Sequence, residues 1–220
     1  MLILHYYPSN ASFAPHVLLY ELGVPFQLQL VDRTQGAHKA ADYLKLNPNG
    51  LIPVLVDGEQ VLYETAAILM HLADAYSPRH PQAQLAPPLG SAERAQYYKW
   101  MLWLSNTMQA MVIHYFYPQR MVADGNTEGA AQVKASAEAR LGDCLAQLDA
   151  LLAGHGAAWI LGAAYSAADP LAFMLCRWTR GFKSRPARDY PHIGPYLQRM
   201  LERPAVQQAV AAEKLPPPVV

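Results

Sequence analysis

A change of pattern near residue 77 constrains the fold of this chain more than any other feature. Before it, short stretches of alternating apolar and polar residues are interleaved with stretches of helical periodicity, whereas beyond residue 90 only helical periodicity remains. The segment between them, residues 77–90, holds four prolines and has no apolar period. We therefore predict an α/β domain at residues 1–78, a linker at 79–90 and an all-α domain at 91–220.

The order of elements follows from the same periodicities. Gly23 stands where a helix needs a left-handed cap, and Asn47–Gly50 is a dense turn signal before a predicted hairpin. The first domain is predicted to have strands at 2–6, 26–31, 52–56 and 61–63 and helices at 13–22, 38–46 and 66–76; the second has helices at 91–117, 128–152, 167–180, 192–202 and 205–212.

Charge and composition exclude several kinds of partner. Seventeen Lys and Arg balance seventeen Asp and Glu, so no net field favours nucleic acid or an acidic membrane. The longest apolar stretch, residues 100–118, is interrupted by five polar residues and is too polar to span a bilayer. Two cysteines are too few for a disulfide scaffold, and no leader pattern is present. We expect a cytoplasmic protein.

Ile52-Pro53 is the strongest local signal for chemistry. Proline cannot donate to a sheet ladder and is expected at edges, strand starts or bulges. A trans proline that opens an edge strand is the commoner explanation, since cis bonds are about 5–6% of X-Pro bonds. A cis bond is the alternative, and it would let the backbone N–H and C=O of Ile52 pair with an extended peptide ligand.

Glu64-Thr65 lies between the last predicted strand and a helix. The free N–H groups and positive dipole end of a helix start attract carboxylates. Thr65 adds a hydroxyl, and Glu64 can accept from a ligand amino group. An ordinary helix cap with an acid beside it is the plainer explanation of the same two residues.

The loop of residues 8–12 joins the first strand to the first helix, where open α/β sheets place their ligands. Ser9, Asn10 and Ser12 are its polar candidates, although plain helix capping by Ser12 or Asn10 is the commoner explanation for any one of them. His38, beside Lys39, is a further candidate for holding a ligand carboxylate, although a solvated polar turn is the commoner case. We find no Ser-His-Asp set, phosphate loop or C-x-x-C motif here, and no pair of histidines with metal-ligand spacing, so we predict no metal.

Two features of the predicted helical domain are mainly structural. Residues 100–117 are rich in methionine and aromatic side chains, most of which we expect in the core, while those that face away could line an adaptable apolar pocket. Ser166 and Asp169 have the spacing of a capping box before an apolar run, with Asp in place of Glu or Gln.

The whole chain resembles the cytosolic glutathione transferases, specifically the bacterial Beta-like branch. The resemblance covers nearly every element and is carried by Asn47–Leu55, Leu62–Ile68, Ser166–Asp169 and Arg203–Val206. It implies a thioredoxin-like domain followed by an all-helical domain, usually assembled as a two-fold homodimer. It also implies glutathione as co-substrate and a small hydrophobic electrophile as second substrate.

The resemblance assigns roles to individual residues. Pro53 matches the family's cis proline, and Ile52 the residue whose backbone pairs with the cysteinyl unit of glutathione. Glu64 and Thr65 match the pair that holds the γ-glutamyl end, with threonine in place of serine. His38 matches a position that binds the glycyl carboxylate in related classes.

The first loop departs from the Beta-class pattern. Pro15-His16 fixes the register, and Ala11 then occupies the position of the Beta-class cysteine, so no protein thiol can form a mixed disulfide there. The resemblance offers Ser9, Ser12 and Asn10, in this order, as the residue that faces the glutathione sulfur.

Three functions are compatible with this sequence. The first is a glutathione transferase that stabilises the thiolate of glutathione and directs it at an electrophile in a cleft between the domains. The second is a glutathione-binding, ligand-carrying or regulatory relative without useful turnover. The third is a glutathione-dependent disulfide or peroxide reductase, which would use the same site with a different second substrate.

Overall fold

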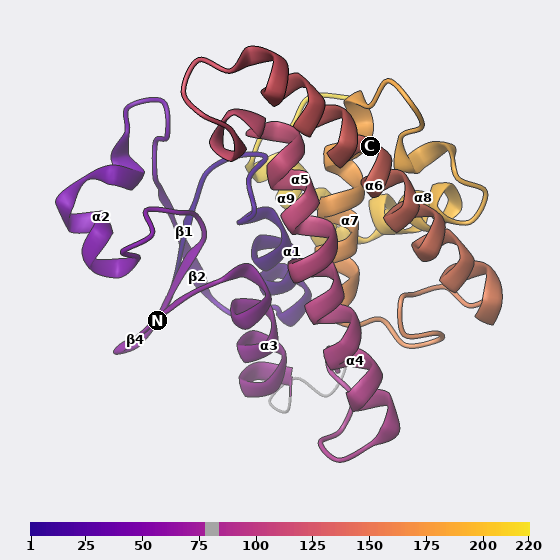
Figure 1. Ribbon diagram of the computed structural model, residues 1–220. Coiled ribbons are helices and arrows are strands. Elements are labelled where there is room, and N and C mark those ends of the chain that lie inside the picture. Colours follow the sequence, from indigo (N-terminus) through magenta and orange to yellow (C-terminus); the bar gives the residue numbers. More distant parts are fainter. Residues whose placement is uncertain (78–83) are drawn as a thin grey trace. The chain divides into compact units, whose positions relative to one another are not determined.

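The computed structural model describes residues 1–77 and 84–220, which divide by packing into two compact units (Figure 1). The first comprises residues 1–87 together with 200–219, and the second comprises residues 88–199 with Val220. The C-terminal helix therefore belongs to the first unit, although it follows the helical segment in the sequence. Part of the predicted linker, residues 79–83, lies outside the described residues.

A four-stranded mixed sheet forms the centre of the first unit. Its strands are β1 (Leu2–Tyr6), β2 (Phe26–Leu30), β3 (Val54–Asp57) and β4 (Gln60–Tyr63), in the spatial order β2-β1-β3-β4. The pair β1 and β2 is parallel, whereas β3 is antiparallel to both β1 and β4. The thioredoxin-like element order that the resemblance implies is thus confirmed.

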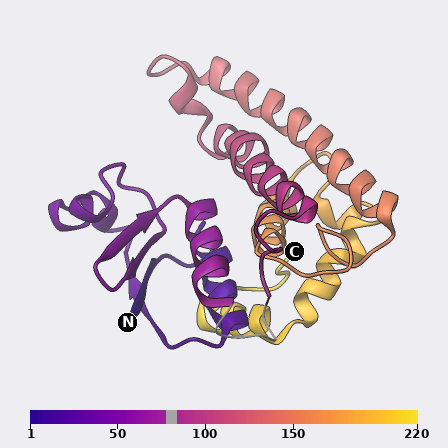
Figure 2. The same ribbon diagram turned by 90° about the horizontal axis from the view of Figure 1, so that it is seen from below.

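Helix α1 (Phe13–Leu22) is the most enclosed helix of this unit. It contacts α3 (Thr65–Tyr76) and α9 (Pro204–Ala212), and eight of its ten residues are buried. Figures 1 and 2 show α1 and α9 side by side although they come from opposite ends of the chain. A helix covered on several sides needs apolar residues all round, which explains why α1 has no polar face. Gly23 ends α1 with a φ of 63°, as predicted.

Two predicted boundaries in the first unit are wrong. The helix expected at 38–46 is divided into a 3-10 turn, η1 (Ala37–Lys39), and α2 (Ala41–Leu46), because Ala40 is extended with a ψ of 146°. The strand expected from residue 52 begins at Val54, since Pro53 has no N–H to give to the ladder.

The second unit is helical throughout, apart from an isolated bridge between Trp159 and Gly162. The helix predicted at 91–117 consists of three parts, because a π-helical segment, η3, separates two α-helices. The described elements are α4 (Ala92–Leu102), η3 (Trp103–Gln109), α5 (Ala110–Phe116), η4 (Pro118–Met121), α6 (Thr127–His155), α7 (Ala168–Trp178), η5 (Thr179–Gly181), η6 (Ala187–Asp189) and α8 (Ile193–Glu202), which ends in the first unit.

Helix α7 is the core of the second unit, and only one of the two bonds of the predicted capping box is present near its start, because the N-cap is Ala167, which makes no side-chain capping bond. Asp169 is fully buried, and its carboxylate accepts from the N–H of Ser166 at 2.8 Å and of Ile160 at 2.9 Å. The Ser166 hydroxyl accepts from the N–H of Ala168 at 3.3 Å. Within the described part of the chain, no helix is both long and apolar enough to cross a membrane.

Buried polar contacts tie the C-terminal segment of the first unit to α1. Glu213, which follows α9, accepts from the backbone N–H of Ser9 at 2.8 Å and is bonded to Nδ1 of His16 at 2.9 Å. The side chains of His16 and Glu213 are both 0% exposed. Arg203, at the start of α9, makes a bidentate ion pair with Glu21 of α1. Glu213 therefore joins the last helix, the first helix and the first loop.

We predict that Glu213→Ala lowers the free energy of unfolding by about 3 kcal/mol, because the buried His16 ring and the partly buried Ser9 N–H lose their acceptor, and each loss costs roughly 1–3 kcal/mol. Denaturant unfolding measures the free energy of unfolding of the variant and of the unmodified protein. The matched control is Glu202→Ala, an exposed acid at the end of α8, for which we expect a change within about 0.5 kcal/mol. Equal stability of the two variants would show that Glu213 does not hold these segments together.

Candidate functional site

The register of the sheet brings all the residues predicted for the site to one end of it. Tyr6 lies opposite Leu30, His5 opposite Val54, and Val54 opposite Tyr63. Four segments therefore meet the sheet at the same end. They are the first loop after β1, the segment after β2 that contains His38, the Ile52-Pro53 pair before β3 and the Glu64-Thr65 pair after β4. Segments that are far apart in the sequence thus lie together at one end of the sheet.

The first loop turns sharply after Tyr7. Ser9 has a φ of 63°, a value that is uncommon outside glycine and often marks functional sites. The N–H of Asn10 is bonded to the carbonyl of Tyr7 at 3.2 Å, and the Glu213 carboxylate holds the Ser9 N–H. The backbone of the loop is thus fixed from two sides.

The Asn10 side chain has a defined orientation. Its Oδ1 accepts from the N–H of Ala11 at 2.7 Å, which identifies the other end of the amide as the nitrogen. No hydrogen bond among the described residues uses this Nδ2, so it is available as a donor to a ligand. Ala11 is buried and contributes only a methyl group.

The Ser12 hydroxyl is engaged within the protein. It accepts from the N–H of Tyr7 at 3.2 Å and donates to the carbonyl of Tyr7 at 3.1 Å, and Ser12 is fully buried. Ser12 precedes α1 but makes no capping bond to it. In this structure Ser12 therefore closes the first loop.

The Ile52-Pro53 bond is cis, as the resemblance implies. The preceding turn is anchored at the Leu51 carbonyl, which accepts from the Tyr43 hydroxyl and from Nδ2 of Asn47, both at 2.8 Å. Burial raises the pKa of Tyr43, which keeps the phenol protonated as a donor. Within the described residues no hydrogen bond uses the backbone N–H or C=O of Ile52, so an extended ligand can pair with them.

Glu64 has the most strained backbone of the predicted site. Its φ of 73° and ψ of 113° lie outside the common regions for an L-residue, and such outliers cluster at ligand clamps. Thr65 is buried and is the first residue of α3. The first bond of this helix runs from Ile68 N–H to the Glu64 carbonyl at 3.0 Å, so the earlier N–H groups of the helix precede its ladder.

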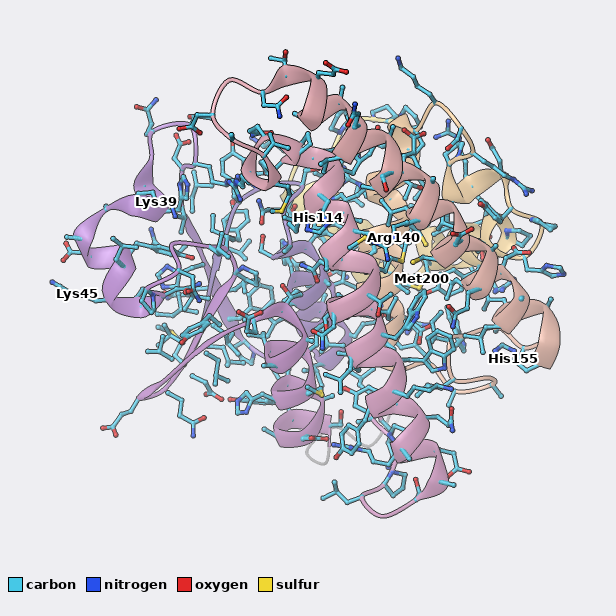
Figure 3. All side chains as sticks on the ribbon, in the orientation of Figure 1. Lys39, Lys45, His114, Arg140, His155 and Met200 are labelled. Atoms are coloured by element: carbon cyan, nitrogen blue, oxygen red, sulfur yellow. The ribbon has the colours of Figure 1, made fainter. Side chains whose placement is uncertain are left out.

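His38 lies in η1, where the turn at residues 47–50 approaches its backbone. Gly50 has a φ of 58°, and a Cβ there would lie 2.8 Å from the His38 carbonyl and 2.6 Å from Nζ of Lys39. Lys39, the last residue of η1, donates to the Asn49 carbonyl at 3.1 Å, and Figure 3 labels its side chain. Only glycine fits this contact, which positions His38 and Lys39 at the same end of the sheet.

The sequence reasoning did not identify Glu213 and His16 as supports of the site. His16 entered only as a marker of register, and Glu213 lies more than 200 residues from the loop that it holds. No local pattern signals such a pair, because an acid in a C-terminal segment is normally solvated.

The helical unit has a cavity of its own. It has a volume of about 300 Å³ between α5 and α6, and Met111, His114, Ala137 and Arg140 are among its lining residues. Figure 3 shows His114 and Arg140 near each other on these two helices. Met111 fits the expectation that part of the methionine-rich segment faces away from the core. Among residues 1–77 and 84–220, no three His, Cys, Asp or Glu side chains are grouped so that they could hold a metal ion.

Comparisons with known proteins agree with this geometry. The family model for the glutathione S-transferase N-terminal domain matches residues 1–74, and that for the C-terminal domain matches residues 103–204. Glutathione S-transferase GstA of Escherichia coli O157:H7 is 32% identical over 96% of this chain and 98% of its own length.

Solved structures give the same assignment. A glutathione transferase homologue from Sulfitobacter with bound glutathione superposes with a TM-score of 0.85 at 27% identity, and covers 98% of this chain and 99% of its own. A bacterial beta class glutathione S-transferase from Sphingomonas chungbukensis superposes with a TM-score of 0.79 at 29% identity, over 97% and 100% of the two chains. With both domains matched and these relatives similar over nearly their whole length, the chain belongs to the glutathione S-transferase family.

Proposed function

We propose that this protein is a glutathione transferase that binds glutathione at the end of the sheet and directs its thiolate at a hydrophobic electrophile. The observation that carries the proposal is the convergence of three features there. These are a strained Glu64 beside the start of α3, the Ile52 backbone, which no hydrogen bond among the described residues uses, and a first loop in which the Asn10 amide nitrogen is likewise not used by the described residues. Each suits a different part of the tripeptide.

The start of α3 receives the γ-glutamyl end. This end carries one carboxylate and one ammonium group, and the helix N-terminus with the Thr65 hydroxyl favours the carboxylate. The exposed Glu64 carboxylate accepts from the ammonium group. The Ile52 backbone pairs with the cysteinyl unit as an added strand would, and His38 receives the glycyl carboxylate.

The first loop stabilises the thiolate. At a reference pKa of about 8.5, about 3% of a thiol is ionised at neutral pH. A hydrogen bond to the charged form contributes roughly 1.5–3 kcal/mol, which lowers the pKa of the thiol by about one to two units. We propose Asn10 Nδ2 and the Ser9 hydroxyl as the donors ahead of Ser12, whose hydroxyl is already bonded to Tyr7 in both directions.

The second substrate is a small hydrophobic molecule, for which we propose the methionine-rich part of the helical unit as the contact surface. Met111 supports this because a flexible thioether adapts to ligands of different shape. Ala11 disfavours only a reductase mechanism that forms a mixed disulfide with the protein, since a protein thiol is missing from the loop. We place the protein in the cytoplasm, where the buried free thiols Cys144 and Cys176 stay reduced.

We also propose a two-fold homodimer. Tyr98 and Leu102 are 40% and 50% exposed, and they are four residues apart on α4, so they lie on one face of that helix. Large exposed apolar residues on one helix face are typical of an interface.

We predict that Thr65→Ala and Glu64→Gln each weaken glutathione binding by about tenfold, because each removes one polar partner of the zwitterionic end. Calorimetric titration measures the dissociation constant. Glu59→Gln, in the turn between β3 and β4, removes an equivalent exposed acid away from the site and is expected to bind normally. Unchanged affinity in both site variants would refute this assignment.

We predict that losing the true donor raises the pKa of bound glutathione by about one to two units and slows conjugation at neutral pH by about tenfold or more. Spectroscopic titration of the thiolate in Asn10→Ala, Ser9→Ala and Ser12→Ala, with rates on a chromogenic aryl halide, identifies the donor. Three unshifted titrations would assign stabilisation to backbone amides or the α1 dipole instead. Turnover of a hydroperoxide or mixed disulfide, but not the aryl halide, would favour the reductase.

We predict that light scattering at micromolar concentration returns twice the chain mass of 24.3 kDa. Leu102→Glu places a charge on the exposed face of α4 and is expected to give monomers, whereas Gln96→Glu, on a different face of the same helix, is expected to leave the dimer intact. A mass near 24 kDa for the unmodified protein would contradict the proposal.

A further inference from the structure

A buried tyrosine of α2 has a hydroxyl that packing alone does not explain. Of the six residues of α2, all of them described, only Tyr43 is buried, whereas Asp42 pairs in solvent with Lys45, which Figure 3 labels. The Tyr43 side chain belongs to an apolar cluster with Ile52 and Val54. Phenylalanine would suit such a cluster, because a buried hydroxyl is tolerated only when it is hydrogen-bonded. The hydroxyl therefore needs a reason other than packing.

The partner of this hydroxyl is a single backbone oxygen. The Tyr43 hydroxyl and Nδ2 of Asn47 both donate to the Leu51 carbonyl, each at 2.8 Å. Asn47 is 2% exposed, and its Oδ1 accepts from the N–H of Asn49 at 3.0 Å, so the orientation of its amide is fixed. Residues 50–53 lie before the first ladder pair of β3. Two side-chain donors therefore hold a peptide group that strand pairing does not hold.

The same peptide group carries the N–H of Ile52. A trans peptide group is planar, and its C=O and N–H point in opposite directions. The bond between Leu51 and Ile52 is trans, and its oxygen faces α2. The Ile52 N–H therefore points away from α2. Two donors on the carbonyl also polarise the peptide group, because linked hydrogen bonds strengthen one another, and this makes the N–H a better donor.

We propose that Tyr43 is a positioning residue for glutathione, which together with Asn47 directs and polarises the Ile52 N–H toward the carbonyl oxygen of the cysteinyl unit. This inference rests on the proposed function, since it concerns the same site. It adds that recognition of one ligand atom depends on a side chain that acts through the peptide group of Leu51 and Ile52. The carbonyl is bound equally before and during the reaction, so Tyr43 contributes to binding and not to the chemical step.

Two analogues of glutathione test the recognition of this carbonyl. γ-Glutamylcysteinamide has the cysteinyl carbonyl, γ-glutamylcysteamine lacks it, and both lack glycine. Calorimetric titration gives the ratio of their dissociation constants. We expect the unmodified protein to bind the first about tenfold more tightly, and Tyr43→Phe to reduce this preference to about twofold. A general loss of packing would weaken both analogues equally, so an unchanged ratio in Tyr43→Phe would overturn the positioning role.

Tyr190→Phe is the matched control. Tyr190 is also buried, and its hydroxyl donates to the backbone carbonyl of Gly142 at 3.3 Å in the second unit. We expect this variant to keep the tenfold preference, because it loses the same kind of bond far from the Leu51 carbonyl in the sequence. A preference that falls as much in Tyr190→Phe as in Tyr43→Phe would overturn the proposal.

Asn47→Asp tests the other donor to the same oxygen. It keeps an acceptor for the Asn49 N–H and replaces the nitrogen that faces the Leu51 carbonyl with an oxygen. We expect the preference between the analogues to fall to about twofold or less. A full tenfold preference in this variant would show that the orientation of the Leu51 carbonyl does not govern recognition, and would overturn the proposal.

Steady-state kinetics with glutathione and a chromogenic aryl halide separate binding from chemistry. We expect Tyr43→Phe to raise KM for glutathione by about fivefold and to leave kcat within about twofold. An equal fall in kcat and kcat/KM would overturn the assignment of Tyr43 to binding. If the unmodified protein binds neither analogue nor glutathione, the proposed function fails. If it binds glutathione and shows the same analogue preference as Tyr43→Phe, the positioning role alone fails.

Discussion

A buried carboxylate near the C-terminal end of the chain determines the shape of the loop near its beginning. Glu213 has no access to solvent at its side chain, and a carboxylate in that position is tolerated only when its oxygens are bonded. Ser9 and His16 supply the partners, one on each oxygen. These two bonds have two effects. The bond to His16 fixes the C-terminal segment after α9 to α1, and the bond to Ser9 holds its backbone in a conformation that is unfavourable for serine by itself. The helical segment that intervenes in the sequence does not supply this support.

The sheet provides the second constraint. Because β1, β2 and β4 all end where β3 begins, four loops are brought together without any long-range signal beyond strand pairing. The polar groups of these loops are not grouped in the sequence, yet the site needs only short, rigid connections to place them. Gly50 shows how tight the arrangement is, since even a methyl group at this position would meet the carbonyl of His38. Backbone geometry, more than side-chain reach, therefore defines the place proposed for the ligand.

The elements that sequence analysis predicted best are those with strong local periodicity, such as β1 and α1 with its Gly23 cap. Ala40 and the π-helical segment η3 were missed because tertiary packing, not propensity, decides whether a helix is continuous. The candidate site residues were assigned through motif resemblance and not through chemistry alone, since a helix cap and a ligand clamp use the same residue types. Neither motif resemblance nor residue chemistry identified Glu213. Its burial depends on the packing of α9 against α1, which no local pattern reveals.

The resemblance aligns Ala11 with the Beta-class cysteine, and this changes what the proposed function requires of the first loop. With no thiol in the loop, the proposed stabilisation of the glutathione thiolate depends on hydrogen-bond donors that are already in place before the ligand binds. A donor on a flexible side chain would lose rotamer entropy with each binding event. Asn10 avoids this cost because the Ala11 N–H already fixes its amide, and Ser9 avoids part of it because Glu213 fixes its backbone. The loop is thus organised by bonds within the protein before glutathione arrives, which is the condition under which a single hydrogen bond contributes most to a developing charge.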